Sequence, residues 1–218
     1  MKTLSKAVAI ASLVSASALT AQVANAEVSA SASVANLYLW RGQNLGANGA
    51  PVMAGSLDYS AESGLYAGIW SSSGDTSFGT ETDLYVGFAG EAGSLSYDIG
   101  YATYLYSGED DVNDVAELII GVGVDAYSAT IYKSTDADAN GDYLYLELGA
   151  EFGDYGLTVG NVSGSEGSTF TSDYTHVDLS YAYNDKLSFT YSQVVAEDVE
   201  DSMDMGGLFV VSYELPIE

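Results

Sequence analysis

The chain has 218 residues, no cysteine, and 31 Asp and Glu residues against 5 Lys and Arg, which gives a formal net charge of −26. So acidic a chain excludes nucleic acid as a partner, because neutralising phosphates requires Lys and Arg. The lack of cysteine excludes a small disulfide-stapled scaffold. With 18 Tyr, 6 Phe and 2 Trp, the composition also argues against disorder, and the length fits one domain.

Residues 1–26 have the three parts of a secretory signal. Lys2 and Lys6 give a positive start, residues 7–19 are small and apolar, and Ala24-Asn25-Ala26 fits a small-x-small cleavage site. The competing interpretation is a transmembrane helix, which requires about 20 apolar residues, more than this run contains. We therefore predict a Sec-type signal peptide over 1–26 and one exported domain over 27–218.

Alternation with a period of two recurs throughout the exported domain, and no stretch of it holds a helical period. In one typical segment Leu84, Val86 and Phe88 alternate with Asp83 and Tyr85. The pattern predicts an all-β fold with about twelve strands, at 28–40, 51–60, 65–73, 81–89, 94–106, 115–125, 127–134, 143–152, 156–162, 174–183, 187–195 and 205–215. Most of these strands are long enough for a tilted crossing of a bilayer.

The connections between the predicted strands alternate in length. Short ones at 61–64, 90–93, 153–155 and 184–186 alternate with longer acidic ones at 74–80, 107–114, 135–142, 163–173 and 196–204. Outer-membrane barrels have this rhythm, with tight periplasmic turns at one rim and longer loops outside. We therefore expect a single antiparallel up-and-down transmembrane β-barrel.

The two faces of the strands differ, but polarity alone does not say which face points outward, because a soluble lipocalin-type barrel buries its apolar face. The position of the charges favours a wet lumen. Acids at mid-strand share a face with Gly, Ser and Tyr, namely Asp58, Asp83, Asp98, Glu117, Glu147 and Asp178. Aromatic residues near strand ends fit interfacial girdles: Tyr38, Trp40, Tyr59, Trp70, Tyr97, Tyr183 and Tyr213.

The first half of the exported domain is similar to a known family. The stretch ANLYLWRG at 35–42, the segment DYSAESGLYAGIW at 58–70 and the segment ETDLYVGFAGEAGSLSYDIGYATYLY at 81–106 resemble the TorF porin family, also called the Gcw_chp family. The second half agrees in its rhythm of strands and turns. The resemblance implies an outer-membrane barrel that acts as a pore for a solute that is not established for the family.

Two residues stand out as candidates for a role inside the barrel. Arg41 is the sole arginine and is expected on the polar face at the end of the first strand. There it either pairs bidentately with lumen carboxylates and narrows the opening, or forms a simple salt bridge at the rim. His176, the sole histidine, shares the polar face with Asp178. We expect both of these residues to line the pore, together with the six mid-strand acids.

Neither catalysis nor cofactor binding has a strong signal. No nucleophile-elbow or phosphate-loop pattern occurs in the chain, so we expect no enzyme activity. Asp136, Asp138 and Asn140, followed by Gly141 and Glu147, match the calcium-loop pattern. Strands flank this segment where the EF-hand has helices, so a solvated acidic turn is the competing interpretation of a Ca²⁺ site.

The function predicted from the sequence is a narrow passive diffusion channel in the cell outer membrane. Its acidic lumen should favour cations over anions. A non-conducting structural or adhesive barrel plugged by large inward tyrosines is one alternative, and a soluble exported barrel that binds a small ligand is another. The expected partners are outer-membrane lipid and lipopolysaccharide, the barrel-assembly machinery and small solutes.

Overall fold

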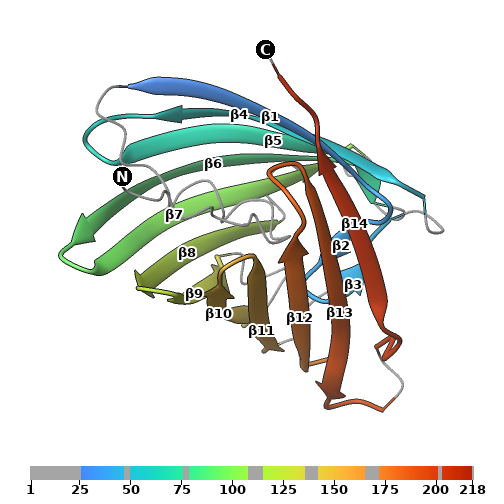
Figure 1. Cartoon of the computed structure of the whole chain (residues 1–218). Coiled ribbons are helices and arrows are strands. Elements are labelled where there is room, and N and C mark those ends of the chain that lie inside the picture. Colours follow the sequence, from blue (N-terminus) through green and yellow to red (C-terminus); the bar gives the residue numbers. More distant parts are fainter. Residues whose placement is uncertain are drawn as a thin grey trace.

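Twelve antiparallel strands close into a single barrel in the computed structural model (Figure 1). The structure describes residues 26–46, 50–75, 79–107, 115–135, 142–164, 172–200 and 203–217. The wall strands are β1 (Glu27–Ala35), β4 (Val52–Ser60), β5 (Leu65–Asp75), β6 (Gly79–Ala92), β7 (Leu95–Tyr106), β8 (Val115–Val124), β9 (Tyr127–Ser134), β10 (Leu144–Phe152), β11 (Tyr155–Ser163), β12 (Tyr174–Ala182), β13 (Leu187–Glu197) and β14 (Leu208–Glu214).

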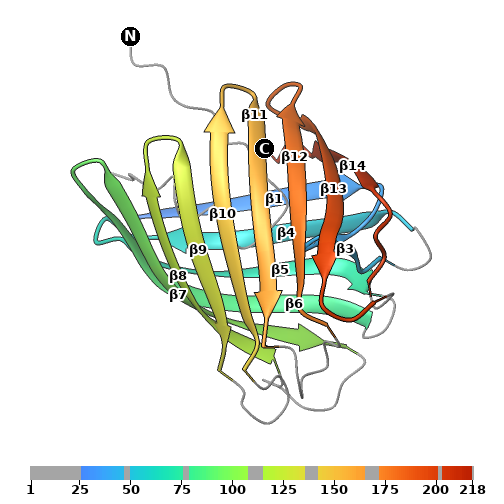
Figure 2. The ribbon, with the colours of Figure 1, turned by 90° about the horizontal axis from the view of Figure 1, so that it is seen from below.

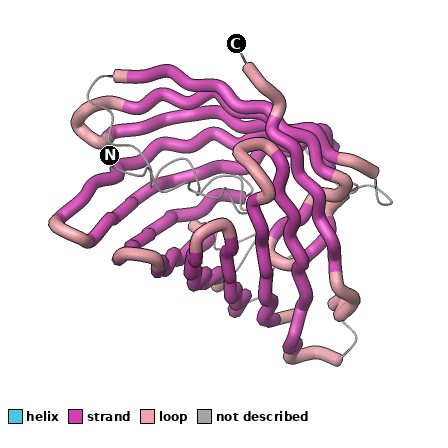
Figure 3. Tube along the Cα trace, in the orientation of Figure 1, coloured by secondary structure: helices cyan, strands magenta, loops and turns pink. Residues whose placement is uncertain are grey.

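The predicted all-β fold and its up-and-down order are confirmed, because each wall strand pairs with its neighbours in the chain and β1 pairs with β14 to close the barrel. The short turns β8–β9, β10–β11 and β12–β13 lie at the same rim (Figure 2). Strand and loop follow one another without any helical segment in the described ranges (Figure 3). No helix among the described residues is long and apolar enough to span a membrane.

The barrel is apolar outside and polar inside. On β8 the alternate residues Leu118, Ile120 and Val122 are exposed, whereas Glu117 and Ile119, which belong to the opposite face, are buried. The other strands have the same alternation, which an up-and-down barrel imposes because neighbouring side chains point to opposite faces. This arrangement is the reverse of a lipocalin-type barrel, whose apolar face would be enclosed.

A belt of exposed aromatic side chains surrounds the short-turn rim, formed by Tyr59, Phe88, Tyr127, Phe152, Tyr155 and Tyr183. Pairs of these aromatic side chains meet across strands, as with Tyr127 and Phe152, whose ring centroids are 6.3 Å apart. Three residues predicted for such girdles lie elsewhere. Tyr38 and Trp70 are buried inside the barrel, and their rings pack against each other, while Trp40 packs against the same buried cluster. Their prediction as interfacial residues is wrong.

The first strand is shorter than predicted. We expected it to run over 28–40, but β1 ends at Ala35, and the chain then leaves the wall. Residues 36–46 turn into the barrel and form a small hairpin from β2 (Leu39–Trp40) and β3 (Gln43–Asn44). Figure 1 shows this hairpin enclosed by the wall strands. Because it lies between β1 and β4, the hairpin belongs to the rim that carries the longer connections.

The pairing of β1 with β14, which closes the barrel, is short. It is extended by Asn36, the residue at which the chain turns inward. All nine residues of β1 pair with β4, but only Ser33, Val34 and Ala35 pair with β14. Asn36 extends this contact with its side chain, because its Nδ2 donates to the Phe209 carbonyl at 2.9 Å and its Oδ1 accepts from the Val211 amide at 2.7 Å. The amide side chain thus continues the pairing beyond the last β1 residue.

Candidate functional site: a hairpin clamped inside the barrel

The tip of the inward hairpin is a two-residue turn made of Arg41 and Gly42. Trp40 pairs with Gln43 across it, and both turn residues have positive φ, 45° and 82°. Two-residue hairpin loops of type I′ require this backbone and favour glycine there. Gly42 is also required sterically, because a Cβ at this position would lie 2.5 Å from the His176 Cβ atom. For Arg41 the left-handed backbone costs about 1 to 2 kcal/mol, so contacts of its side chain must offset that strain.

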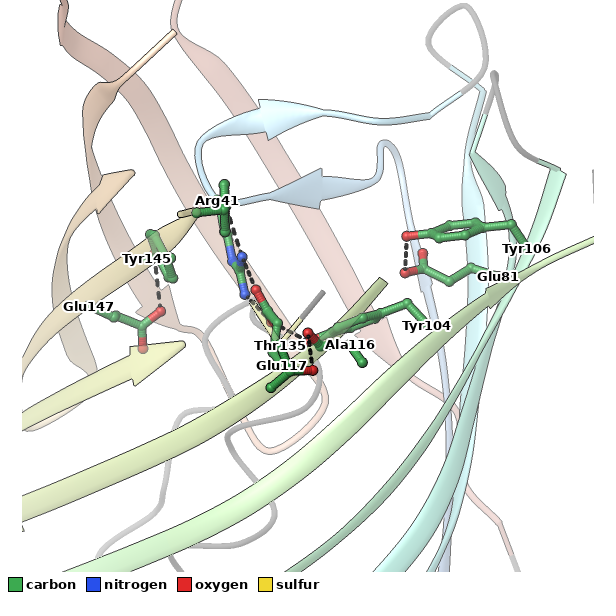
Figure 4. A network of polar contacts seen from close by, with 10 residues as sticks. Arg41, Glu81, Tyr104, Tyr106, Ala116, Glu117, Thr135, Tyr145 and Glu147 are labelled. Atoms are coloured by element: carbon green, nitrogen blue, oxygen red, sulfur yellow. Dashed lines mark hydrogen bonds and ion pairs between the residues drawn. The ribbon is translucent and has the colours of Figure 1, made fainter. Parts of the chain in front are cut away.

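The Arg41 guanidinium is bound bidentately to a wall carboxylate. Its two terminal nitrogens donate to the two oxygens of Glu117 on β8, at 2.8 and 2.7 Å. The Tyr143 hydroxyl accepts a further bond from Arg41 at 2.8 Å, and the Tyr104 hydroxyl donates to Glu117 at 2.6 Å. Arg41 and Glu117 are 6% and 3% exposed. The parallel, fully enclosed pair fixes both position and orientation of the hairpin tip (Figure 4).

Four aromatic rings surround the same guanidinium. The Arg41 Cζ atom lies 4.6 Å from the ring centroid of Trp40, 4.8 Å from Tyr132, 5.5 Å from Tyr143 and 4.5 Å from Tyr145. Ring faces attract cations at these distances, more strongly when water is excluded. Burial alone would lower the pKa of Arg41, but the adjacent Glu117 carboxylate outweighs it and leaves that pKa well above its usual value. The hairpin tip therefore carries a permanent positive charge.

His176 on β12 packs directly against the tip of the hairpin. Its Nδ1 lies 3.0 Å from an Asp178 oxygen, and its Nε2 lies 3.0 Å from the Tyr145 hydroxyl. The imidazole also stacks on the Tyr145 ring, with centroids 5.9 Å apart. The His176 side chain lies close to Gly42 of the hairpin and to Gly160 of β11. A Cβ atom at either glycine would clash with it. His176 is thus held by the wall and supports the turn above it.

Further contacts attach the hairpin to opposite sides of the wall. The Tyr38 hydroxyl, just before β2, donates to Glu81 on β6. Across the barrel, the Tyr174 hydroxyl on β12 accepts from Gln43 at 2.5 Å and donates to the Arg41 carbonyl at 2.9 Å. Leu39 of the hairpin packs with Val210 of β14 in a small apolar cluster. Anchors on β6, β8, β12 and β14 therefore hold the hairpin across the lumen.

The model of one protein family, Gcw_chp, matches residues 20–202 of the chain. Its description reads "Bacterial protein of unknown function". The chain belongs to the Gcw_chp family. This membership confirms the family resemblance drawn from ANLYLWRG and the two strand segments that follow it. Among curated protein sequences, no significant match to the chain was found.

Among solved structures, this Gcw_chp barrel shares its fold with the KdgM porin. One KdgM structure aligns with a TM-score of 0.51 at 9% identity, and covers 88% of this chain and 100% of KdgM. A second, described as the KdgM porin in complex with disordered oligogalacturonate, aligns with a TM-score of 0.50 at the same identity and coverage. At such identity the likeness concerns the fold, which is that of a porin barrel.

The sequence-predicted acids of this Gcw_chp barrel all lie on its inner face, but in different surroundings. Glu117 is bound to Arg41, Asp178 to His176, and one oxygen of Glu147 to the Tyr145 hydroxyl at 3.2 Å. Asp58 accepts from Ser56 and Tyr85, and Asp98 accepts from Tyr66 at 3.1 Å. The Asp83 Oδ1 has no hydrogen-bond partner among the described residues. The site therefore joins Arg41, Glu117, His176 and Asp178 and leaves the others along the wall.

Two sequence expectations about the site require correction or stay open. Arg41 does not end the first wall strand, as predicted, but lies at the tip of a hairpin inside the barrel, because the chain leaves the wall after Ala35. Asp136, Asp138 and Asn140 lie outside the described residues, so the Ca²⁺ site stays a prediction. Within the described ranges, no group of three or more acidic or His side chains is placed to hold a metal ion.

Several residues of the site were missed by the sequence. Trp40 and Gln43 belong to the hairpin and Glu81 binds Tyr38 beside it, and none of the three was predicted to lie in the lumen. One local signal was available. Glycine after Arg41, in the middle of an otherwise strand-like stretch, is compatible with a tight hairpin turn.

Proposed function

We propose that the protein is a passive diffusion channel of the outer membrane, narrowed by the hairpin at 36–46, for small cationic and neutral solutes. The observation that carries this proposal is the Arg41–Glu117 clamp, which holds a chain segment across the inside of a closed porin-type barrel. A segment fixed in this way reduces the open cross-section and brings its own charge to the narrowest level. Solutes then pass beside the hairpin.

The outer surface supports a location in the outer membrane. Its exposed side chains are mainly aliphatic along the strands, with the aromatic belt at the short-turn rim, as in barrels surrounded by lipid. Closure leaves no long sheet edge exposed to the hydrocarbon. We propose that residues 1–26 direct export, that the assembly machinery inserts the barrel, and that lipopolysaccharide surrounds its outer half.

The preference for cations is inferred from the balance of charges on the inner face. Among the described residues, the inner face has one arginine, one histidine and seven carboxylates, those of Asp58, Glu81, Asp83, Asp98, Glu117, Glu147 and Asp178. Carboxylates lining a narrow low-dielectric passage raise the local concentration of cations and oppose anions. Oligogalacturonate, the ligand in one KdgM structure, is polyanionic. We therefore propose a different class of solute for this chain.

A non-conducting structural barrel is the second candidate. The observation that favours it is the buried cluster of Tyr38, Trp70, Tyr104, Tyr132, Tyr143, Tyr145 and Tyr174, which in this alternative fills the lumen around the hairpin. Such a filled interior is the usual state of the smallest barrels.

Conductance in planar bilayers separates the two candidates. The protein, purified from outer membranes, is inserted under a KCl gradient, and single-channel steps and the reversal potential are measured. Stepwise conductance with a reversal potential on the cation side is expected. A barrel that inserts, migrates as a heat-modifiable folded species and never conducts contradicts the channel and leaves the structural barrel.

A further inference from the structure

Five of the inner-face acids differ in the side chains that bind them. On one side of the lumen Glu117 is paired with Arg41, and Asp178 with His176. On the arc formed by β4 to β7, the carboxylates of Asp58 and Asp98 accept only from hydroxyl groups, and the Asp83 Oδ1 has no hydrogen-bond partner among the described residues. No ion pair joins Asp58, Asp83 or Asp98 to Arg41, Lys133 or Lys186 in the described part of the chain. Three carboxylates bound only by hydroxyl groups or lacking a partner at one oxygen therefore lie on one wall, and Glu147 on β10, which accepts from the Tyr145 hydroxyl, lies outside it.

Asp83 is the most isolated carboxylate of this arc. It is 2% exposed, and its Oδ1 has no hydrogen-bond partner among the described residues. In the sheet register it stands between Trp70 on β5 and Tyr104 on β7. A carboxylate oxygen enclosed without a donor is costly, so it requires a proton or a cation. Aromatic neighbours offer a bound cation their ring faces in addition.

Asp98 is a second buried carboxylate of this arc, and it lies nearer the short-turn rim. It is 6% exposed, its Oδ1 accepts from the Tyr66 hydroxyl at 3.1 Å, and its Oδ2 has no partner among the described residues. Asp98 pairs with Ala89 of β6, which is six residues from Asp83 on the same strand. At about 3.3 Å per residue the two carboxylates are therefore roughly 20 Å apart along the wall.

We propose that Asp83 and Asp98 are two successive binding positions for small monovalent cations, of the alkali or ammonium kind, on the β4–β7 wall. The proposal rests on the proposed channel function and assigns the path of the cations within it. Each position supplies one uncompensated carboxylate, which matches a single positive charge. The docked hairpin spans the lumen from β6 to β12, and its guanidinium is fixed against Glu117 on β8, outside the arc. Cations then move along the arc, first past Asp83 beside the hairpin and then past Asp98.

The test compares charge removal on the two sides of the lumen. Asp83→Asn and Asp98→Asn each remove one unpaired carboxylate with little change of shape, and Asp178→Asn removes one on the opposite side. Asp154→Asn, in an exposed short turn, is the matched control. We expect the potassium-to-chloride permeability ratio to fall roughly threefold in the first two variants. It should change less in Asp178→Asn and stay unchanged in Asp154→Asn.

Wild-type protein supplies a second measurement that needs no variant to fold. Cations that bind in the lumen make conductance saturate as KCl or NH₄Cl concentration rises, whereas a channel without binding positions conducts in proportion to salt. A linear dependence, or an unchanged permeability ratio in both Asp83→Asn and Asp98→Asn, overturns the proposal and indicates that these carboxyls are protonated. A wild-type barrel that never conducts contradicts the channel itself, which is a different failure.

Discussion

Arg41 and Glu117 lie 76 positions apart in the chain, yet two parallel hydrogen bonds of 2.8 and 2.7 Å join them inside the barrel. Both side chains are almost fully enclosed. Replacing both members of such a pair with apolar groups changes the stability of a protein little. Removing only one member leaves the other charged and buried, which is strongly destabilising. The pair therefore fixes where the hairpin lies, and its loss should release the hairpin.

Replacement of Arg41 by Ala should undock the hairpin. The buried Glu117 loses the guanidinium that pairs with it, and removing one member of such a pair costs about 3 to 5 kcal/mol. We expect a lower midpoint of urea unfolding and, in the bilayer, a larger and noisier conductance. Arg41→Lys should recover only part of the difference, because an ammonium cannot form the bidentate contact.

Guanidinium ions in solution should partly restore the Arg41→Ala barrel. The space beside Glu117, lined by Tyr132, Tyr143 and Tyr145, retains both the carboxylate and the ring faces that hold the natural group. Millimolar methylguanidinium is expected to raise the thermal midpoint of the variant more than an equal concentration of methylammonium does. Equal effects of the two ions on the variant would show that the cage does not recognise the guanidinium shape.

Gly42→Ala should destabilise the docked hairpin more than a turn glycine elsewhere. The new Cβ meets the His176 ring, and the residue keeps a φ of 82°. Gly93→Ala is the matched control, because Gly93 has a φ of 70° in a short turn with nothing within 4 Å of an added Cβ. The control should cost about 1 kcal/mol from backbone strain alone. A Gly42 variant no less stable than the control would contradict the contact with His176.

Asn36→Ala should weaken the closure between β1 and β14. The change removes both side-chain bonds to Phe209 and Val211, at roughly 1 to 3 kcal/mol for the unsatisfied backbone groups. Hydrogen exchange should accelerate at the amides of β14 and less at those of β8. Asn184→Ala, which removes two bonds within an exposed short turn, is the control and should leave exchange on β14 unchanged.

Ile120→Arg should oppose membrane insertion. Ile120 lies in the middle of β8 with its side chain exposed on the apolar outer face, and an arginine facing lipid near the midplane costs about 2 to 4 kcal/mol. Refolding into lipid vesicles should fall accordingly, as measured by the heat-modifiable band on gels. Glu62→Arg, in an exposed turn at the rim, should refold like the parent chain. Equal refolding of both variants would argue against a lipid-facing β8.

The strands could be predicted because their signal is local. Residues 115–125 alternate between apolar and polar or small side chains, and the strand occurs at Val115–Val124. The lengths of the connections likewise indicated the up-and-down order, since a two-residue turn permits only an antiparallel neighbour. The family could be predicted too, because the segments that resembled it lie within the matched residues 20–202.

By itself, then, the sequence determined that the domain is an up-and-down barrel of about twelve strands with one polar and one apolar face. The mid-strand charges also predicted which face is enclosed, but only the tertiary structure decided where the first strand ends and that Arg41 lies on a hairpin inside the barrel. Residues 37–40 alternate like a continuing strand, and nothing local stops them. Their inward course is decided by partners on β6, β8 and β12, and contacts between residues so distant in the chain exist only once the barrel has closed.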